Sequence, residues 1–335
     1  MLVLAPAMLA GAAPAQNDGE QQPYAPLEQA LRQTTLAGLV GLLNNETLSR
    51  EAGFTGVELP PALLQRFAAQ PVQGHRLYEH PQSGLLLRLG LAPRGVNWLR
   101  LRYHSEHSEH SEHAQPLSGW YDQALGAPLS SLAGAMVALA NDGAGRRFLA
   151  SLGNPIEQRA LRAFAQLPAT LQTADSARLL VSACAGESCH AQALLALDRR
   201  AEQGGDGLWQ LDLAVLGRDW RRFDRLMTQL QVRLGPDPTL AWLASSAWVH
   251  RQNCAAALEQ AVPAQRRWPE YLPLYSLLAQ CQVEQGDYPQ ALETLLQMQS
   301  RFGLQLDWDA LVRDPAYAPL AGSEAFRAWR QASPE

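Results

Sequence analysis

Apolar residues follow a helical spacing near the start of the chain. Between Leu27 and Leu43, leucines stand at positions 27, 31, 36, 39, 42 and 43. An amphipathic helix turns one apolar stripe toward a core at this spacing, so the stretch predicts one helix. A second, short helix is expected at 63–70, because Pro60 and Pro61 precede it and proline is tolerated in a first helical turn.

The period changes between Arg76 and Tyr103. Turn-forming residues at 80–84 and 92–95 separate three runs that are rich in leucine, tryptophan and tyrosine. In the third run, one set of alternate positions is Leu99, Leu101 and Tyr103, and the other is Trp98, Arg100 and Arg102. This is the pattern of a strand with one buried and one solvated face. These runs predict a small antiparallel sheet.

From Ala124 onward the composition is helical, and an internal repeat appears. Phe223, Ala257 and Ala291 are 34 residues apart, as are Trp220, Cys254 and Tyr288, and one further period back from Phe223 reaches Cys189. Pro269 closes one unit, and Gly235 stands at the same phase in the unit before. A fixed period of this length is typical of stacked helical hairpins.

The clearest copy is the segment 275–302, YSLLAQCQVEQGDYPQALETLLQMQSRF. Its aromatic start at Tyr275, its pair Leu278-Ala279 and its turn Gly286-Asp287-Tyr288 resemble the tetratricopeptide repeat, and the chain resembles an exported bacterial protein of that family. Other units depart from the pattern, since Asn253-Cys254 replaces the Asp-Tyr of the turn in one of them. The resemblance covers about 170–302 and implies hairpins that share a continuous core.

The fold expected from these patterns is mainly α: a C-terminal α-solenoid of tetratricopeptide-like helical hairpins, with a smaller N-terminal α+β region that contains a short antiparallel sheet. The predicted parts are a signal peptide (1–15), a linker (16–22), the α+β region (23–115), a helical connector (116–169), the repeats (170–303) and a C-terminal cap (304–335). In the cap, Trp308, Leu311, Tyr317, Leu320, Phe326 and Trp329 are expected to cover the open end of the repeats.

Composition excludes several activities. All 27 cationic residues are arginine, so chemistry that needs a lysine amine of this chain is excluded, including Schiff-base catalysis and the P-loop lysine. The net charge of −5 argues against nucleic-acid binding. No nucleophile elbow, zinc-protease motif or dinucleotide fingerprint occurs, so no catalytic residue and no cofactor are assigned, and a non-enzymatic role is expected.

The first fifteen residues are apolar and end in Ala13-Pro14-Ala15, which resembles a secretory signal peptide without its charged n-region. No other apolar run is long enough to span a membrane. The four cysteines favour an oxidising compartment. A periplasmic or secreted protein without membrane insertion is therefore expected.

Within the repeat frame, Cys184 would end one helix and Cys189 begin the next, while Cys254 and Cys281 fall on adjacent hairpins. This frame favours bridges Cys184–Cys189 and Cys254–Cys281 among the three possible pairings. A metal site formed by Cys184, Cys189 and His190 is the alternative, although it lacks a second half.

Four histidines recur every third residue, at His104, His107, His110 and His113. Imidazoles at this spacing are weak candidates for a metal site, because successive steps of three drift around a helix. The favoured interpretation is a hydrophilic loop. Similarly, Arg88, Arg100 and Arg102 beside Trp98 are interpreted as an ordinary solvated sheet face rather than a ligand patch.

In arrays that this chain resembles, the first helices of the hairpins line a groove that binds a peptide. Carried over, the groove positions are Arg178, Ser182, Leu208, Asp212, Trp242, Ser246, His250, Ser276, Gln280 and Glu284. The alternative for Leu208 and Trp242 is a place in the core, and for Trp242 neither interpretation is favoured. The expected partner is a protein or peptide, and the expected function is that of an adaptor or assembly factor. The alternative is a hydrolase or ligand-binding N-terminal domain, which a cavity with converging His75, Glu79 or Arg100 would favour.

Overall fold

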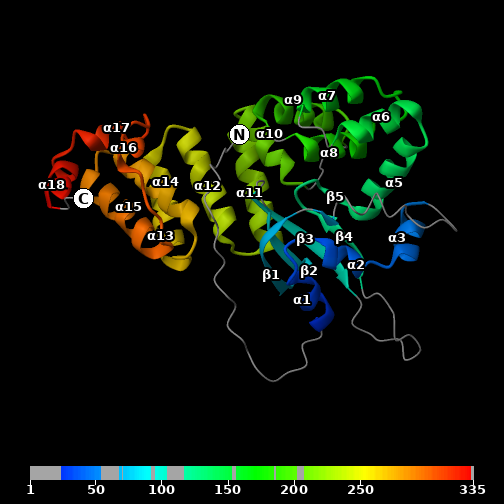
Figure 1. Ribbon diagram of the computed structural model, residues 1–335, viewed down its shortest axis with the longest axis horizontal. Helices are drawn as coiled ribbons and strands as arrows, with labels where there is room; N and C mark the ends of the chain where they lie inside the picture. The colour runs from blue at the N-terminus through cyan, green and yellow to red at the C-terminus, as the bar shows by residue number, and fades with distance from the viewer. Residues whose placement is uncertain are drawn as a thin grey trace. The chain divides into compact units, whose positions relative to one another are not determined.

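The computed structural model describes residues 24–53, 68–69, 71–91, 95–103, 117–152, 156–184, 186–201 and 207–332 (Figure 1). These residues form mostly helices and one five-stranded antiparallel sheet, which confirms the coarse fold class. The chain divides into two compact units between Leu226 and Met227. The predicted signal peptide and linker, most of the helix expected at 63–70, and the four-histidine run lie outside the described residues.

The sheet of the N-terminal unit has its strands in chain order, each antiparallel to the next (Figure 1). The strands are β1 (Val72–His80), β2 (Gly84–Leu91), β3 (Gly95–Tyr103), β4 (Leu117–Asp122) and β5 (Ala127–Pro128). The three predicted runs become β1 to β3. The sheet continues beyond the predicted boundary at residue 115, because β4 and β5 fall in the segment expected to be a helical connector.

One face of the sheet is buried under three short helices, α1 (Ala25–Leu31), α2 (Ala37–Gly41) and α3 (Asn45–Glu51). Leucines from alternate positions of β2 and β3 form a core with leucines of these helices: Leu27, Leu31, Leu39, Leu43, Leu48, Leu85, Leu87, Leu89, Leu99 and Leu101. The period-two pattern of the strands therefore identified the leucine face as buried. The expectation that the opposite face is solvated is wrong at Trp98, which is 0% exposed, as is Leu86 on the same face.

The single helix expected from Leu27 to Leu43 is wrong, since α1 and α2 are separate. The backbone between them is used by the sheet: Thr34 O accepts from Val72 N at 2.8 Å, and Thr35 forms a bridge with Pro71. The break also lets the two helices approach closely, because a Cβ on Gly38 would lie 2.2 Å from the carbonyl oxygen of Ala30.

The rest of the N-terminal unit is helical, and its helices share a second core that includes Phe148, Phe164, Leu180, Leu194 and Trp209. The helices are α5 (Leu129–Ala140), α6 (Gly143–Ser151), α7 (Glu157–Ala165), α8 (Ala174–Ala183), α9 (Glu187–Asp198) and α10 (Trp209–Leu216). Helix α11 (Trp220–Leu234) follows and crosses the boundary between the two units.

The C-terminal unit contains two helical hairpins and three shorter terminal helices. Its elements are α12 (Pro238–His250), α13 (Cys254–Arg267), α14 (Leu272–Glu284), α15 (Tyr288–Phe302), α16 (Trp308–Leu311), α17 (Ala318–Ala321) and α18 (Glu324–Ala332). Helix α14 packs on α12, α13 and α15. The predicted cap residues contact the α14–α15 core, and Leu320 and Phe326 are buried in it.

Three helix–turn–helix units have the same turn at 34-residue intervals. One residue of each turn has a positive φ: Arg218 (53°), Gln252 (57°) and Gly286 (76°). The next residue is Asp219, Asn253 or Asp287; its N–H donates to the carbonyl five residues earlier at 2.9 Å, and its side chain accepts the N–H three residues later. The aspartate or asparagine thus caps the second helix.

The second helices also begin in the same register. Trp220, Cys254 and Tyr288 are the first residues of α11, α13 and α15. Three residues further on, Phe223, Ala257 and Ala291 are at most 3% exposed. The 34-residue period of the sequence predicts equivalent environments for these three positions. All three are buried, one in each helix–turn–helix unit.

Two disulfides pair the four cysteines as the repeat frame favoured, Cys184–Cys189 and Cys254–Cys281. The first joins the end of α8 to the start of α9, and the second joins α13 to α14. No group of three or more His, Cys, Asp or Glu side chains in the described part of the chain could hold a metal ion. The metal alternative for Cys184 and Cys189 is therefore wrong, because both thiols are consumed by the bridge.

The repeated turn predicts the effect of glycine at one position. A non-glycine residue in the left-handed region costs roughly 1–2 kcal/mol. Glycine avoids this cost, but it loses more conformational entropy on folding, which offsets part of the gain. We expect Gln252→Gly to raise the free energy of unfolding by about 0.5–1 kcal/mol, and Gly286→Gln to lower it similarly, as measured by urea unfolding. Gln285 has φ −81°, so Gln285→Gly is the control; stabilisation by that change as well would contradict the assignment.

The two disulfides should differ in their contribution to stability. They close loops with sequence separations of 27 and 5 residues, and the chain-entropy model gives about 3.5 and about 2 kcal/mol respectively. The double variant Cys254→Ala/Cys281→Ala should therefore lower the free energy of unfolding more than Cys184→Ala/Cys189→Ala. Unfolding midpoints in urea compare them, and equal losses would show that loop closure does not set the difference.

Candidate functional site

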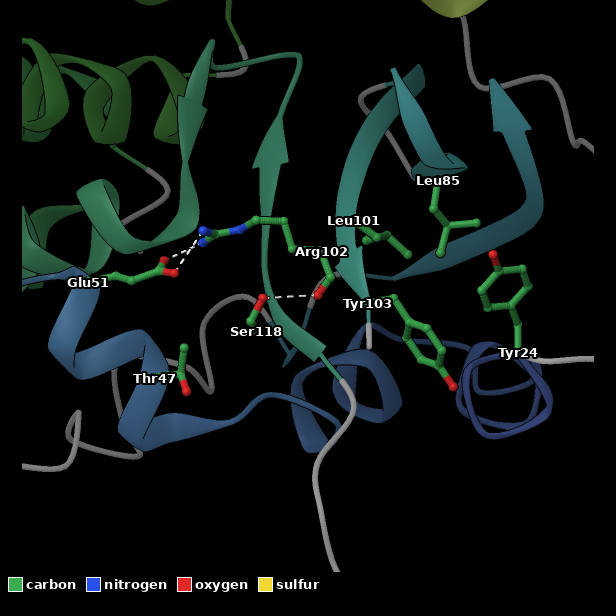
Figure 2. Close-up of a pocket in the computed structure, with 8 residues that line it drawn as sticks. All are labelled: Tyr24, Thr47, Glu51, Leu85, Leu101, Arg102, Tyr103 and Ser118. Atoms are coloured by element: carbon green, nitrogen blue, oxygen red, sulfur yellow. Dashed lines mark hydrogen bonds and ion pairs between the residues drawn. The ribbon is translucent and has the colours of Figure 1, made fainter. Parts of the chain in front are cut away.

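A pocket of about 460 Å³ opens at the end of the sheet where β3 finishes and β4 begins (Figure 2). Its volume lies in the range of small-molecule sites. Helices α1 and α3 and strands β2, β3 and β4 contribute its lining, which consists of Tyr24, Thr47, Glu51, Leu85, Leu101, Arg102, Tyr103 and Ser118.

One wall of the pocket is an arginine–glutamate pair. Arg102 Nη1 donates to Glu51 Oε1 at 2.7 Å, and Nη2 donates to Oε2. The guanidinium reaches α3 by lying across β4 at Gly119, where a Cβ would come within 3.0 Å of Nη2. Ser118 Oγ donates to Arg102 O at 3.1 Å on the same wall. The pair leaves this wall close to neutral while the guanidinium retains further N–H donors.

Two tyrosines form the opposite side. The rings of Tyr24 and Tyr103 meet edge to face with centroids 5.3 Å apart. Tyr24 donates its hydroxyl to Glu79, and this hydrogen bond, with burial and the nearby carboxylate charge, raises the pKa of Tyr24 to about 12. Burial likewise raises the pKa of Tyr103. Both phenols are therefore protonated at neutral pH.

The lining combines aromatic rings and two leucines with a hydroxyl at Thr47 and a charge-neutralised arginine. Such a surface can bind an uncharged ligand that has an apolar face and several hydroxyl or amide groups.

A buried polar cluster fixes the opposite end of these strands, where β3 begins and β4 ends. Asp122 Oδ1 accepts from Asn97 Nδ2 and from Leu125 N, both at 3.0 Å, while Asn97 Oδ1 accepts from Ala124 N at 2.9 Å. Burial raises the pKa of Asp122, and the hydrogen bonds from Leu125, Asn97 and Ala124 oppose that rise. These hydrogen bonds hold the turn between β4 and β5. In the same turn, Gln123 O accepts a hydrogen bond from Leu208 N at 2.7 Å.

The N-terminal residues singled out from the sequence do not converge in the pocket. His75 Nε2 lies 3.5 Å from Glu28 Oε2, Glu79 accepts from Tyr24, and Arg100 lies over the ring of Tyr121. None of the three lines the pocket. Of the three sheet arginines considered with Trp98, which are Arg88, Arg100 and Arg102, only Arg102 lines the pocket.

The predicted groove positions divide between the two units. In the N-terminal unit, Arg178 is bound to Asp175 at 2.6 Å and to Leu125 O at 3.0 Å, and Asp212 lies 3.1 Å from His190 Nε2. Both side chains therefore already have partners within their own unit.

In the C-terminal unit, α14 leaves four of its residues unburied, Pro273, Ser276, Gln280 and Glu284. Three of them are the predicted groove positions of that helix. We call these four residues the α14 stripe. Helix α12 differs, because Trp242 and Ser246 are 7% and 4% exposed while His250 is exposed. Trp242 and Ser246 thus belong to the core and offer no surface to a ligand.

Sequence reasoning missed Tyr24, Thr47, Glu51 and Ser118. These pocket residues come from three separate places in the chain, the residue before α1, helix α3 and strand β4. They belong to no local motif, so only the folded chain brings them together. No protein-family model, curated protein or solved structure matches the chain. No helix in the described part of the chain is long and apolar enough to cross a membrane.

The raised pKa of Asp122 predicts a pH dependence of stability. Between the ordinary aspartate value, about 3.9, and the higher folded value, the folded chain retains a proton that the unfolded chain has lost. Stability is then fully present below the ordinary value and falls as pH rises through the folded value. Asp122→Asn cannot titrate, so its unfolding midpoint should fall less between pH 4 and pH 8.

The control for this experiment is Asp198→Asn, which makes the same chemical change on a half-exposed side chain. Its pH profile should follow that of the unmodified protein. A profile of Asp122→Asn that also coincides with the unmodified protein would show that Asp122 does not titrate differently on folding.

Proposed function

We propose that the chain is a non-enzymatic interaction module that binds a protein or peptide on the α14 stripe of a tetratricopeptide-like array. The observation that supports this most directly is the recurrence of one turn, one helix cap and one buried contact every 34 residues. Hairpins of equal geometry stack readily into solenoids, and their first helices then form a continuous surface.

The surface itself has the right character for a peptide. Ser276 and Gln280 are half-buried and Glu284 is exposed, so the stripe offers hydroxyl, amide and carboxylate groups on a rigid helix. Pinning α13 to α14 by Cys254–Cys281 preorganises this surface, which reduces the ordering cost of binding.

The proposed location is the periplasm or the extracellular space. Two disulfides are compatible with an oxidising compartment, and the apolar N-terminal segment resembles an export signal. An adaptor or assembly factor outside the cytoplasm is the role that combines this location with a binding surface.

Photo-crosslinking tests the proposed surface. A photoreactive amino acid at Gln280 or Glu284 should form an adduct with a defined partner, identified by mass spectrometry. The matched control is Gln297, an exposed glutamine on α15, where the same adduct should be absent. Gln280→Arg should then weaken binding of the purified partner about tenfold, because a bulky charge replaces a small polar contact.

Equal adducts at Gln297 and Gln280 would contradict binding on the α14 stripe. Absence of any adduct from both α14 positions, in cells that contain the natural partners, would contradict the interaction role itself.

The pocket of the N-terminal unit favours a second function, the binding of a small uncharged ligand such as a monosaccharide. Saturation-transfer NMR with methyl glycosides of glucose, galactose and N-acetylglucosamine tests this. Tyr103→Leu should abolish the transfer, whereas Tyr288→Leu, at the start of α15, should leave it unchanged. Transfer that is absent, or equal in both variants, would contradict a role for the pocket.

A further inference from the structure

Strand β1 is an edge of the sheet that the described residues form. It is nine residues long, and its ladder partner among those residues is β2. Beyond the contact of Val72 N with Thr34 O, no main-chain hydrogen bond joins its outer side to another described element. A long edge strand of this kind is a template for a further strand, and proteins that leave one open commonly use it for pairing.

The strand registers determine which backbone groups face outward. Trp98 O points toward β4, because it accepts from Gln123 N at 2.9 Å. The backbone N–H and C=O groups of successive residues point to opposite sides of a strand. Leu99 and Leu87 therefore direct these groups toward each other between β3 and β2. By the same alternation, Leu86 and Tyr78 direct theirs toward each other between β2 and β1. His75, Leu77 and Glu79 therefore present their N–H and C=O groups to the open edge.

The side chains along this edge are self-complementary about Leu77. If a second β1 ran antiparallel with Leu77 opposite its own copy, His75 would face Glu79 of that copy, and Arg76 would face Tyr78. Arg76 already lies over the ring of Tyr78 in its own strand, 5.4 Å from the centroid, so the two side chains suit a cation–π contact. Opposite charges and arginine–aromatic pairs stabilise facing positions in antiparallel strands.

We propose that β1 pairs with β1 of a second copy of this chain, forming a two-fold symmetric dimer with one continuous sheet. The groups around the pairing are compatible with it. Glu79 and Arg76 are exposed, and His75 is half-buried. On the helix-covered face, Glu28 lies beside His75 and Tyr24 beside Glu79, so each imidazole of the pair would lie between two carboxylates. A two-fold axis makes both copies contribute the same residues.

A charge exchange tests this arrangement. His75→Glu should place a second carboxylate opposite Glu79 of the other copy, and Glu79→Lys should place an ammonium group opposite His75. Each variant alone should dimerise at least tenfold more weakly than the unmodified chain, because two facing pairs become unfavourable. Mixing the two variants should restore a heterodimer, since one facing pair becomes glutamate–lysine and the other keeps the original residues.

Analytical ultracentrifugation of the full chain, with its disulfides intact, measures the outcome. The unmodified protein should reach twice its mass of 36.6 kDa at high micromolar concentration. The control is Glu46→Lys, which changes an exposed glutamate on α3 and should leave dimerisation unchanged. A purely monomeric protein overturns the proposal, and so do single variants that dimerise normally or a mixture that fails to recover.

Discussion

The helical half of this protein depends on a left-handed residue followed by a helix-capping side chain. At Arg218, Gln252 and Gly286 the chain reverses in one residue, and the next side chain satisfies an N–H at the start of the following helix. This turn fixes where the second helix begins, and therefore which residue lies against the first helix. The small buried side chains of Ala257 and Ala291 allow the close contact that results.

The N-terminal unit is organised by a different constraint, the need to cover one face of a narrow sheet. Short helices cover the leucine face, and the pocket lies where α1, α3 and the ends of β3 and β4 meet (Figure 2). Gly119 leaves room for Arg102 to cross β4 and pair with Glu51 on the pocket wall. The edge strand of the same sheet, β1, supplies the surface proposed for self-association. The two proposed surfaces are adjacent, because Tyr24 of the pocket donates its hydroxyl to Glu79 of β1.

The sequence predicted those features that repeat or alternate. The 34-residue phase placed Phe223, Ala257 and Ala291 in equivalent buried positions, and the repeat frame led to the cysteine pairing that the structure contains. Alternation of Leu99 and Leu101 with Arg100 identified a half-buried strand. These signals come from local geometry, which short sequence patterns encode directly.

Features that depend on distant partners were not predictable in this way. The separation of α1 from α2 follows from the contact of Thr34 with Val72, and Trp242 is buried although its phase suggested a groove position. The pocket residues Tyr24, Thr47 and Glu51 have no motif, since their proximity arises only when the helices fold onto the sheet. Likewise, β4 lies beyond residue 115, where the sequence placed the end of the α+β region.

Backbone chemical shifts measured by NMR at residues 218, 252 and 286 test the repeated turn most directly. We expect the left-handed signature at all three positions, with slow amide exchange at Asp219, Asn253 and Asp287, whose N–H groups are bonded to the preceding helix. Right-handed or extended shifts at Arg218 or Gln252, while Gly286 alone is left-handed, would contradict three equivalent hairpins and would remove the support for the proposed binding surface.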